Sequence, residues 1–151
     1  MRKFKKIIFI LLIGFFEPID VKENNLVFHG AYAFETFKGQ KVVAVYVSIF
    51  NNSDEVFKVN SISTDISSKA EIHDVLIEND IVKMKKVKNL VINANDQVYM
   101  QPGGMHIMLM NLNKELEDGS FFFLNFSFDN KTSKKVKVMV LNKKMKENFI
   151  N

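Results

Sequence analysis

The chain lacks several residue types, and each absence narrows what the protein can be. Its 151 residues contain no cysteine, which excludes a disulfide framework and a thiolate metal site. Tryptophan is also absent, and two prolines and six glycines are too few for a collagen-like or low-complexity chain. Apolar residues make up 47% of the sequence, which is enough to build the core of one ordinary domain.

Acidic residues are missing from the first sixteen positions, so the charge of the chain is unevenly distributed. The formal net charge is +4, but four basic residues precede residue 17, and the other 17 basic residues balance 17 acidic ones. The basic character therefore belongs to the N-terminus. A lysine-rich stretch at residues 131–146 is typical of a solvated strand face and tail. We expect no nucleic-acid partner.

The first sixteen residues resemble an export signal. A basic start is followed by an apolar run from Ile7 to Phe16, which is too short for an ordinary spanning helix and typical of a signal peptide. No small-residue cleavage motif closely follows Phe16. Residues 1–16 are therefore predicted to be either a signal peptide or an uncleaved N-terminal anchor, and residues 17–25 a polar linker. We expect a periplasmic domain, soluble or tethered to the inner membrane.

From residue 26 onward, apolar residues mostly recur at every second position, which is the period of a β-strand. The longest such runs cover residues 41–51, 122–128 and 135–140. Shorter runs occupy 26–34, 55–64, 70–78, 81–87, 89–92, 97–101 and 106–111, with turn-forming residues between them. No segment has a convincing helical stripe. The pattern predicts one all-β sandwich or barrel over residues 26–141, followed by a basic tail at 142–151.

Four residues combine into a candidate metal site: His73, Met84, His106 and Met108. Ten residues separate the first two, 21 the second and third, and one the last two. Imidazole nitrogen and thioether sulfur form a soft, uncharged donor set that suits Cu(I) better than other common biological metals. Composition alone gives this pattern with a chance on the order of one in ten thousand, so the spacing is informative.

The strand period places the first pair on one face. A two-residue turn at Asn79–Asp80 pairs His73 with Lys86, so that His73 and Met84 become diagonal neighbours with Cβ atoms roughly 7–8 Å apart. In an oxidising compartment, thioethers also avoid the disulfide formation that would remove thiols from a metal site.

The second pair lies two residues apart on one strand, so His106 and Met108 also share a face. Ile107 and Leu109 then point into the core. The turn-forming sequence at residues 102–104 immediately precedes this strand and is expected to position His106. Other residues of the same types are expected to have ordinary roles: His29 at the surface, and Met100, Met110 and Met139 in the core.

At these residues the chain resembles the PCu(A)C family of periplasmic copper chaperones, whose signature is H-x10-M-x21-H-x-M. Residues 102–112, Pro-Gly-Gly-Met-His-Ile-Met-Leu-Met-Asn-Leu, resemble the family segment P-G-G-x-H-x-M-L-M-x-L. Residues 44–51 resemble its A-x-Y-x-x-x-x-N strand, and the similarity covers roughly residues 26–141. The resemblance implies a cupredoxin-like Greek-key β-sandwich that binds Cu(I). The implied ligands are His73, Met84, His106 and Met108.

The resemblance further implies that the chain delivers copper to the CuA centre of cytochrome c oxidase. Its partners would be the oxidase subunit that carries CuA, or the assembly factors of that subunit. Some relatives bind a second copper through a His/Met-rich tail, but residues 143–151 hold only Met145, so no second site is expected. We expect a monomer.

Two other functions are compatible with the same residues. The chain could buffer periplasmic copper for tolerance with an identical site, or it could be a metal-free secreted β-sandwich interaction module. An enzyme is not expected, because no Ser/His/Asp or Cys/His set and no phosphate-binding glycine loop is evident. A blue-copper electron carrier is excluded by the absence of a cysteine thiolate.

Overall fold

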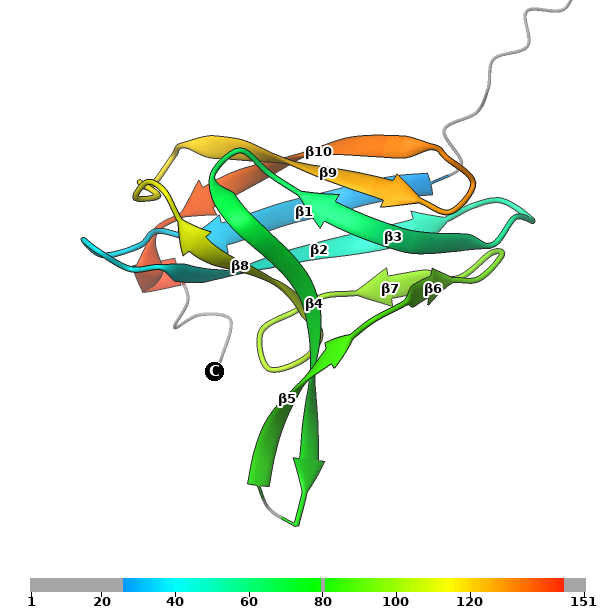
Figure 1. Ribbon diagram of the computed structural model, residues 1–151, viewed down its shortest axis with the longest axis horizontal. Coiled ribbons are helices and arrows are strands. Elements are labelled where there is room, and N and C mark those ends of the chain that lie inside the picture. Colours follow the sequence, from blue (N-terminus) through cyan, green and yellow to red (C-terminus); the bar gives the residue numbers. More distant parts are fainter. Residues whose placement is uncertain (1–25, 80, 146–151) are drawn as a thin grey trace, which may run out of the picture.

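The computed structural model describes residues 26–79 and 81–145, and most of them lie in ten β-strands (Figure 1). The strands are β1 (Leu26–Phe34), β2 (Val42–Asn51), β3 (Phe57–Ser63), β4 (Ser67–Glu78), β5 (Ile81–Val87), β6 (Leu90–Ile92), β7 (Gln97–Tyr99), β8 (His106–Leu112), β9 (Phe121–Phe128) and β10 (Ser133–Leu141). Each predicted run corresponds to one of these strands, so the all-β prediction is confirmed. The predicted export segment 1–16, linker 17–25 and final six residues of the tail lie outside the described residues.

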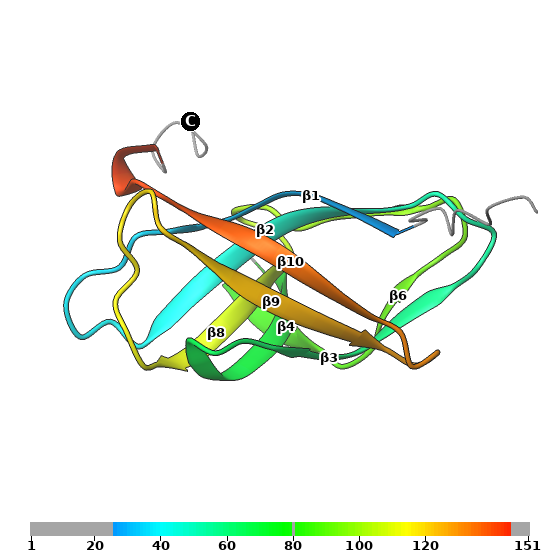
Figure 2. The same ribbon diagram turned by 90° about the horizontal axis from the view of Figure 1, so that it is seen from above.

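The strands form one sheet that curls around a common core. Their order is β5-β4-β8-β2-β1-β10-β9-β3-β6, and β7 pairs with β2. Pairing is antiparallel except between β1 and β10. Although β3 and β4 lie near opposite ends of this order, they contact each other, so the two halves of the sheet face one another (Figure 2). Within the described residues, no helix is long and apolar enough to cross a bilayer.

The core comes from the alternation that the sequence shows. Val45 and Ile49 of β2 are fully buried, as are Leu124 and Phe126 of β9 and Val138 of β10. Successive strand residues point to opposite faces, so each strand contributes every second side chain to the interior. The alternate apolar residues of the three longest predicted runs are all buried, which confirms that each run has one inward face: Val43, Val45, Val47, Ile49, Phe122, Leu124, Phe126, Phe128, Val136, Val138 and Val140.

The hairpin of β4 and β5 projects from the body of the sandwich as an arm (Figure 1). Its register pairs Glu78 with Ile81 and His73 with Lys86, as the two-residue turn predicts. Asn79 has a φ of 51°, a left-handed conformation that asparagine tolerates in tight hairpin turns. Strand β5 lies at the edge of the sheet, so among the described strands it pairs with β4 alone.

Asn51, the buried last residue of β2, links the loop that follows β2 to the loop that follows β6. The Asn51 amide donates hydrogen bonds to the carbonyl oxygens of Glu55 (2.6 Å) and Asn93 (2.7 Å). Its side-chain oxygen accepts from the hydroxyl of Ser53 at 2.7 Å. Buried polar groups require such partners, so the asparagine of the A-x-Y-x-x-x-x-N strand has a structural role.

Candidate metal centre

The candidate ligands share the outer face of the sheet, where β4 and β8 pair side by side. His73 on β4 lies directly opposite His106 on β8. Ile107 and Leu109 point the other way and are fully buried, as predicted. Met108 lies two residues beyond His106 and therefore projects from the outer face too. The pairing of β4 with β8 is what brings the two predicted ligand pairs together.

A tight turn positions His106 at the start of β8. The N–H of Gly104 donates to the carbonyl of Gln101 at 3.0 Å, and Gly103 between them has a φ of 79°. With Pro102 in the second position, this is the pattern of a type II turn, which needs glycine in the third. The turn also aims the Gly104 carbonyl at His106, whose Nδ1 lies 2.9 Å from it. His106 is only 5% exposed, and its Nε2 is buried without a hydrogen-bond partner among the described residues.

His73 also forms one hydrogen bond through its ring, but with the other nitrogen, Nε2. Its Nε2 lies 3.1 Å from Oε2 of Glu71, the residue two positions earlier on the same face of β4. Its Nδ1 is buried and has no hydrogen-bond partner within the described part of the chain. The rings of His73 and His106 are 5.9 Å apart between centroids and cross at 69°. Each ring therefore uses one nitrogen for a hydrogen bond and keeps the other buried and unpaired.

The two thioethers differ in their surroundings. Met84 on β5 pairs with Val75, midway along the paired part of the arm, and is 63% exposed. Met108 is half-buried and lines an open groove of about 560 Å³, together with Phe34, Tyr46 and other residues of β1 and β2. One sulfur is thus open to solvent, and the other borders a mostly apolar depression beside the site.

Next to the four candidate ligands, the carboxylate of Glu71 forms ion pairs with Lys69 and Lys86. Hydrogen bonds from Lys86, His73 and Lys69 lower the pKa of Glu71 from 4.5 to about 2, so the carboxylate stays ionised at neutral pH. Burial raises the pKa of Tyr46, whose neutral ring lies 6.4 Å from that of His106. The four candidate donors themselves are uncharged when both histidines are neutral, as a soft cation site requires.

Sequence reasoning placed all four residues on faces that the structure brings together, but it did not single out Glu71, which contacts His73. A usable signal existed, because a carboxylate two positions before a histidine on a strand must share its face. No group of three or more His, Cys, Asp or Glu side chains suited to a metal occurs among residues 26–79 and 81–145. Two imidazoles with two thioethers are a different kind of set.

The remaining histidine and methionine predictions have mixed outcomes. His29 is exposed and Met100 is 3% exposed, as predicted. Met139 was predicted to lie in the core, which is wrong: it is 38% exposed, because it alternates with the buried Val138 and Val140 on β10. Met110 is half-buried on the outer face and not in the core, because it follows Met108 by two residues on β8.

Comparison with known proteins gives the family. The sequence profile described as "Putative lipoprotein LpqE-like" matches residues 26–140, which is most of the chain and almost all of its described strands. The chain belongs to the LpqE-like family. The match contains all four candidate ligands.

Two relatives of this LpqE-like chain are similar to it over about two thirds of its length. RP573 of Rickettsia prowazekii, described as uncharacterised, is 34% identical over 100 residues, covering 66% of this chain and 55% of that protein. The putative lipoprotein Lxx21020 of Leifsonia xyli is 26% identical over 103 residues, covering 68% and 62%. The matched region thus spans less than two thirds of either relative.

Solved structures similar to this LpqE-like chain include PCuAC domains. The copper-bound PCuAC domain from PmoF2 superposes with a TM-score of 0.66 at 14% identity, covering 78% of this chain and 93% of that one. The Cu(I) form of DR1885 from Deinococcus radiodurans gives a TM-score of 0.62 at 23% identity, covering 76% of both chains. The cupredoxin-like fold implied by the PCu(A)C resemblance is therefore confirmed.

Proposed function

We propose that this chain is a Cu(I) carrier that binds one ion through His73, Met84, His106 and Met108. The observation that carries the proposal is a pair of buried nitrogens without a hydrogen-bond partner in the described part of the chain: Nδ1 of His73 and Nε2 of His106, on facing residues of adjacent strands. Burying a polar atom without a partner is unfavourable, and a bound cation would remove that cost at both nitrogens.

The separation of the two rings fits a shared ion. A ring nitrogen lies roughly 1.1 Å from its centroid and a metal–nitrogen bond is about 2.0 Å, so two rings on one ion have centroids no more than about 6.2 Å apart. The observed 5.9 Å is below this limit, which applies to nitrogens on opposite sides of the ion. A tetrahedral angle at the same bond lengths gives about 5.1 Å, so the two rings must approach each other by about 0.8 Å when four ligands bind one ion. Neutral nitrogen and sulfur donors favour monovalent, soft Cu(I) over divalent ions, which gain more from carboxylates or thiolates.

The environment of the sulfurs suits transfer better than storage. Met84 is 63% exposed, so an incoming ligand from an acceptor can reach the ion from that side and replace one donor at a time. The groove beside Met108 offers a second surface for an acceptor. We therefore favour a carrier over an enzyme, since transfer needs accessible donors and no catalytic group.

The identity of the protein that receives the copper is inferred from the family resemblance. We propose that the acceptor is the cytochrome c oxidase subunit that carries CuA, or one of its assembly factors. The proposed location is the periplasm, with the predicted segment 1–16 as signal or tether. The lipoprotein descriptions of the family and of Lxx21020 support an exported, membrane-associated protein.

The binding test is a Cu(I) titration of the protein in competition with a chromophoric chelator. We expect one ion per chain, and loss of that binding when Met84→Ala and Met108→Ala are combined. Met139→Ala, which removes an exposed methionine from β10, is the matched control and should bind normally. A stoichiometry other than one, or binding that survives the double substitution, contradicts the proposal. Absence of Cu(I) binding by the wild type would instead support the metal-free interaction module.

Delivery and copper buffering use the same site and need a cellular test. Deleting the gene and growing cells in copper-poor medium should lower cytochrome c oxidase activity if the chain delivers copper. Restoration by added copper identifies a supply defect. Unchanged oxidase activity together with greater sensitivity to excess copper would assign the protein to buffering.

A further inference from the structure

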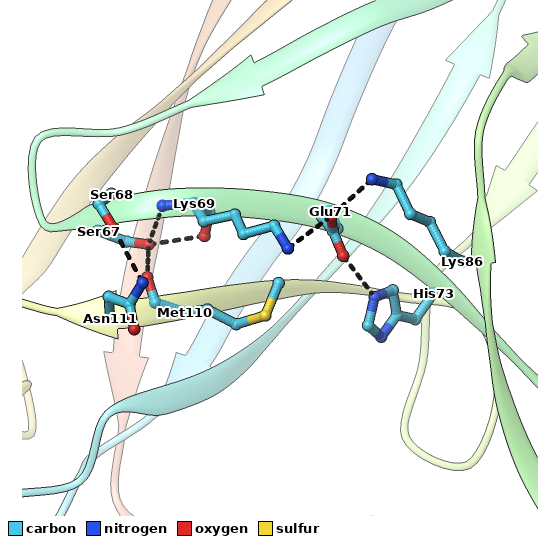
Figure 3. A network of polar contacts seen from close by, with 8 residues as sticks. All are labelled: Ser67, Ser68, Lys69, Glu71, His73, Lys86, Met110 and Asn111. Atoms are coloured by element: carbon cyan, nitrogen blue, oxygen red, sulfur yellow. Dashed lines mark hydrogen bonds and ion pairs between the residues drawn. The ribbon is translucent and has the colours of Figure 1, made fainter.

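Glu71 makes an unusual set of contacts beside the candidate centre (Figure 3). Its Oε2 accepts from Nε2 of His73 at 3.1 Å, while its Oε1 is paired with Lys69 (3.0 Å) and Lys86 (2.5 Å). The carboxylate therefore divides its oxygens, one for the histidine and one for the two lysines. Its side chain is only 12% exposed, so the arrangement is not an ordinary solvated ion pair.

The other pair that links β4 to β5 shows the contrast. Glu78 and Lys83 lie 2.9 Å apart near the end of the arm, with side chains 57% and 55% exposed. Exposed pairs of this kind contribute little to stability because water screens them. Glu71 differs in being covered, in having three partners, and in touching a candidate ligand.

The contact with Glu71 decides which nitrogen of His73 is available. A carboxylate can only accept a hydrogen bond, so Nε2 of His73 must carry the proton, and Nδ1 keeps its lone pair. His106 has the opposite arrangement, since its Nδ1 donates to the Gly104 carbonyl and its Nε2 keeps the lone pair. Carboxylates and carbonyls that hold metal-binding histidines in this way fix both the tautomer and the ring orientation.

We propose that Glu71 is a positioning residue that turns Nδ1 of His73 toward the Cu(I) site, and that Lys69 and Lys86 hold its carboxylate in place. The inference rests on the proposed copper function. Lys86 lies directly across from His73 and two residues after Met84 on the same face of β5. Through Lys86, the carboxylate also ties the strand that carries Met84 to the strand that carries His73.

The test begins with the metal-free protein, so that its result does not depend on copper. In ¹⁵N-resolved NMR spectra at neutral pH, we expect His73 of the wild type as a single tautomer with an Nε2–H proton protected from exchange with water. Glu71→Ala should remove the protection of that proton. Lys86→Gln keeps the carboxylate but removes one of its two lysine partners, so the Nε2–H tautomer should remain while its proton exchanges faster than in the wild type. Glu78→Ala controls for loss of a β4–β5 ion pair.

An Nδ1–H tautomer of His73 in the wild type overturns the proposal even if Glu71→Ala fails to fold. Unchanged exchange protection in a folded Glu71→Ala protein overturns it as well. In the chelator competition, Glu71→Ala should weaken Cu(I) binding roughly 10–100-fold, while Glu78→Ala leaves it unchanged. Equal affinities of Glu71→Ala and wild type also overturn the proposal. If the wild type bound no Cu(I), the proposed function would fail, whereas the tautomer measurement would still report on Glu71.

Discussion

At the scale of single residues, hydrogen bonds to neighbouring groups select the donor atoms of the candidate centre. Glu71 occupies Nε2 of His73, and the Gly104 carbonyl occupies Nδ1 of His106. The sequence predicted which residues these would be, because residue type and spacing are local information. The sequence did not predict which ring nitrogen of each histidine would remain available for a metal. That depends on the Gly104 carbonyl, which the turn positions, and on the Glu71 carboxylate, which the sheet positions.

Met108 and Met110 provide a matched comparison, because both are half-buried on the outer face of β8. Leucine is close to methionine in volume but cannot bind a metal. We expect Met108→Leu to weaken Cu(I) binding roughly tenfold or more, and Met110→Leu to leave it unchanged, in the same chelator competition. Equal losses in the two variants would contradict the assignment of Met108 and implicate the whole methionine pair.

Glu71 also predicts a pH dependence for the stability of the metal-free protein. Its folded-state pKa of about 2 lies below the ordinary value of 4.5, so its favourable contribution is present above pH 4.5 and is lost as the pH falls toward 2. Urea unfolding at several pH values should show wild type more stable than Glu71→Ala at pH 6, with the difference shrinking between pH 4.5 and 2. If the difference in unfolding free energy stayed constant over this pH range, the charge of the Glu71 carboxylate would not be what stabilises the folded protein.

At the scale of elements, the β4–β5 hairpin decides where Met84 points. The two-residue turn after Glu78 sets the register, and the register puts Met84 on the face of His73. Turn chemistry and alternation are both readable from sequence, which explains why this register could be predicted. That the hairpin projects as an arm, with Met84 exposed, was not predictable, because it depends on how the rest of the sheet covers β4.

Exchanging two neighbouring residues tests the importance of that face. The double variant Met84→Lys with Lys85→Met keeps the composition but moves the thioether to the opposite side of β5. We expect it to bind Cu(I) as weakly as Met84→Ala. Lys85→Met alone, which keeps Met84 in place, should bind like the wild type. Normal affinity in the double variant would show that a nearby sulfur suffices, whatever its direction.

At the scale of the whole molecule, the curled sheet carries the candidate centre on its outer face and the core on its inner face. Buried residues of β2, β8, β9 and β10 form one core, and the outer face of β4, β8 and β5 carries the candidate donors. The loops at the opposite end of β2 are joined by Asn51, whose amide contacts Glu55 and Asn93.

We expect Asn51→Ala to lower the free energy of unfolding by about 1–3 kcal/mol, because it removes the hydrogen bonds from the buried Asn51 amide to the carbonyl oxygens of Glu55 and Asn93. Urea denaturation of the metal-free protein measures this. Asn125→Ala, at an exposed position of β9, is the control and should change stability by no more than about 0.5 kcal/mol. A small effect of Asn51→Ala would mean that water replaces the amide, so that the loops do not depend on it.

The sequence by itself determined the strands, their inward faces and the four candidate ligands, because each follows from alternation, turn chemistry or residue type over short stretches. Only the tertiary structure decided that β4 pairs with β8, which sets His73 opposite His106. It also decided that Glu71 and the Gly104 carbonyl leave two buried nitrogens unpaired, and that Met84 is exposed while Met108 borders a groove. These features come from contacts between strands far apart in the chain, where the local pattern carries no information about the partner.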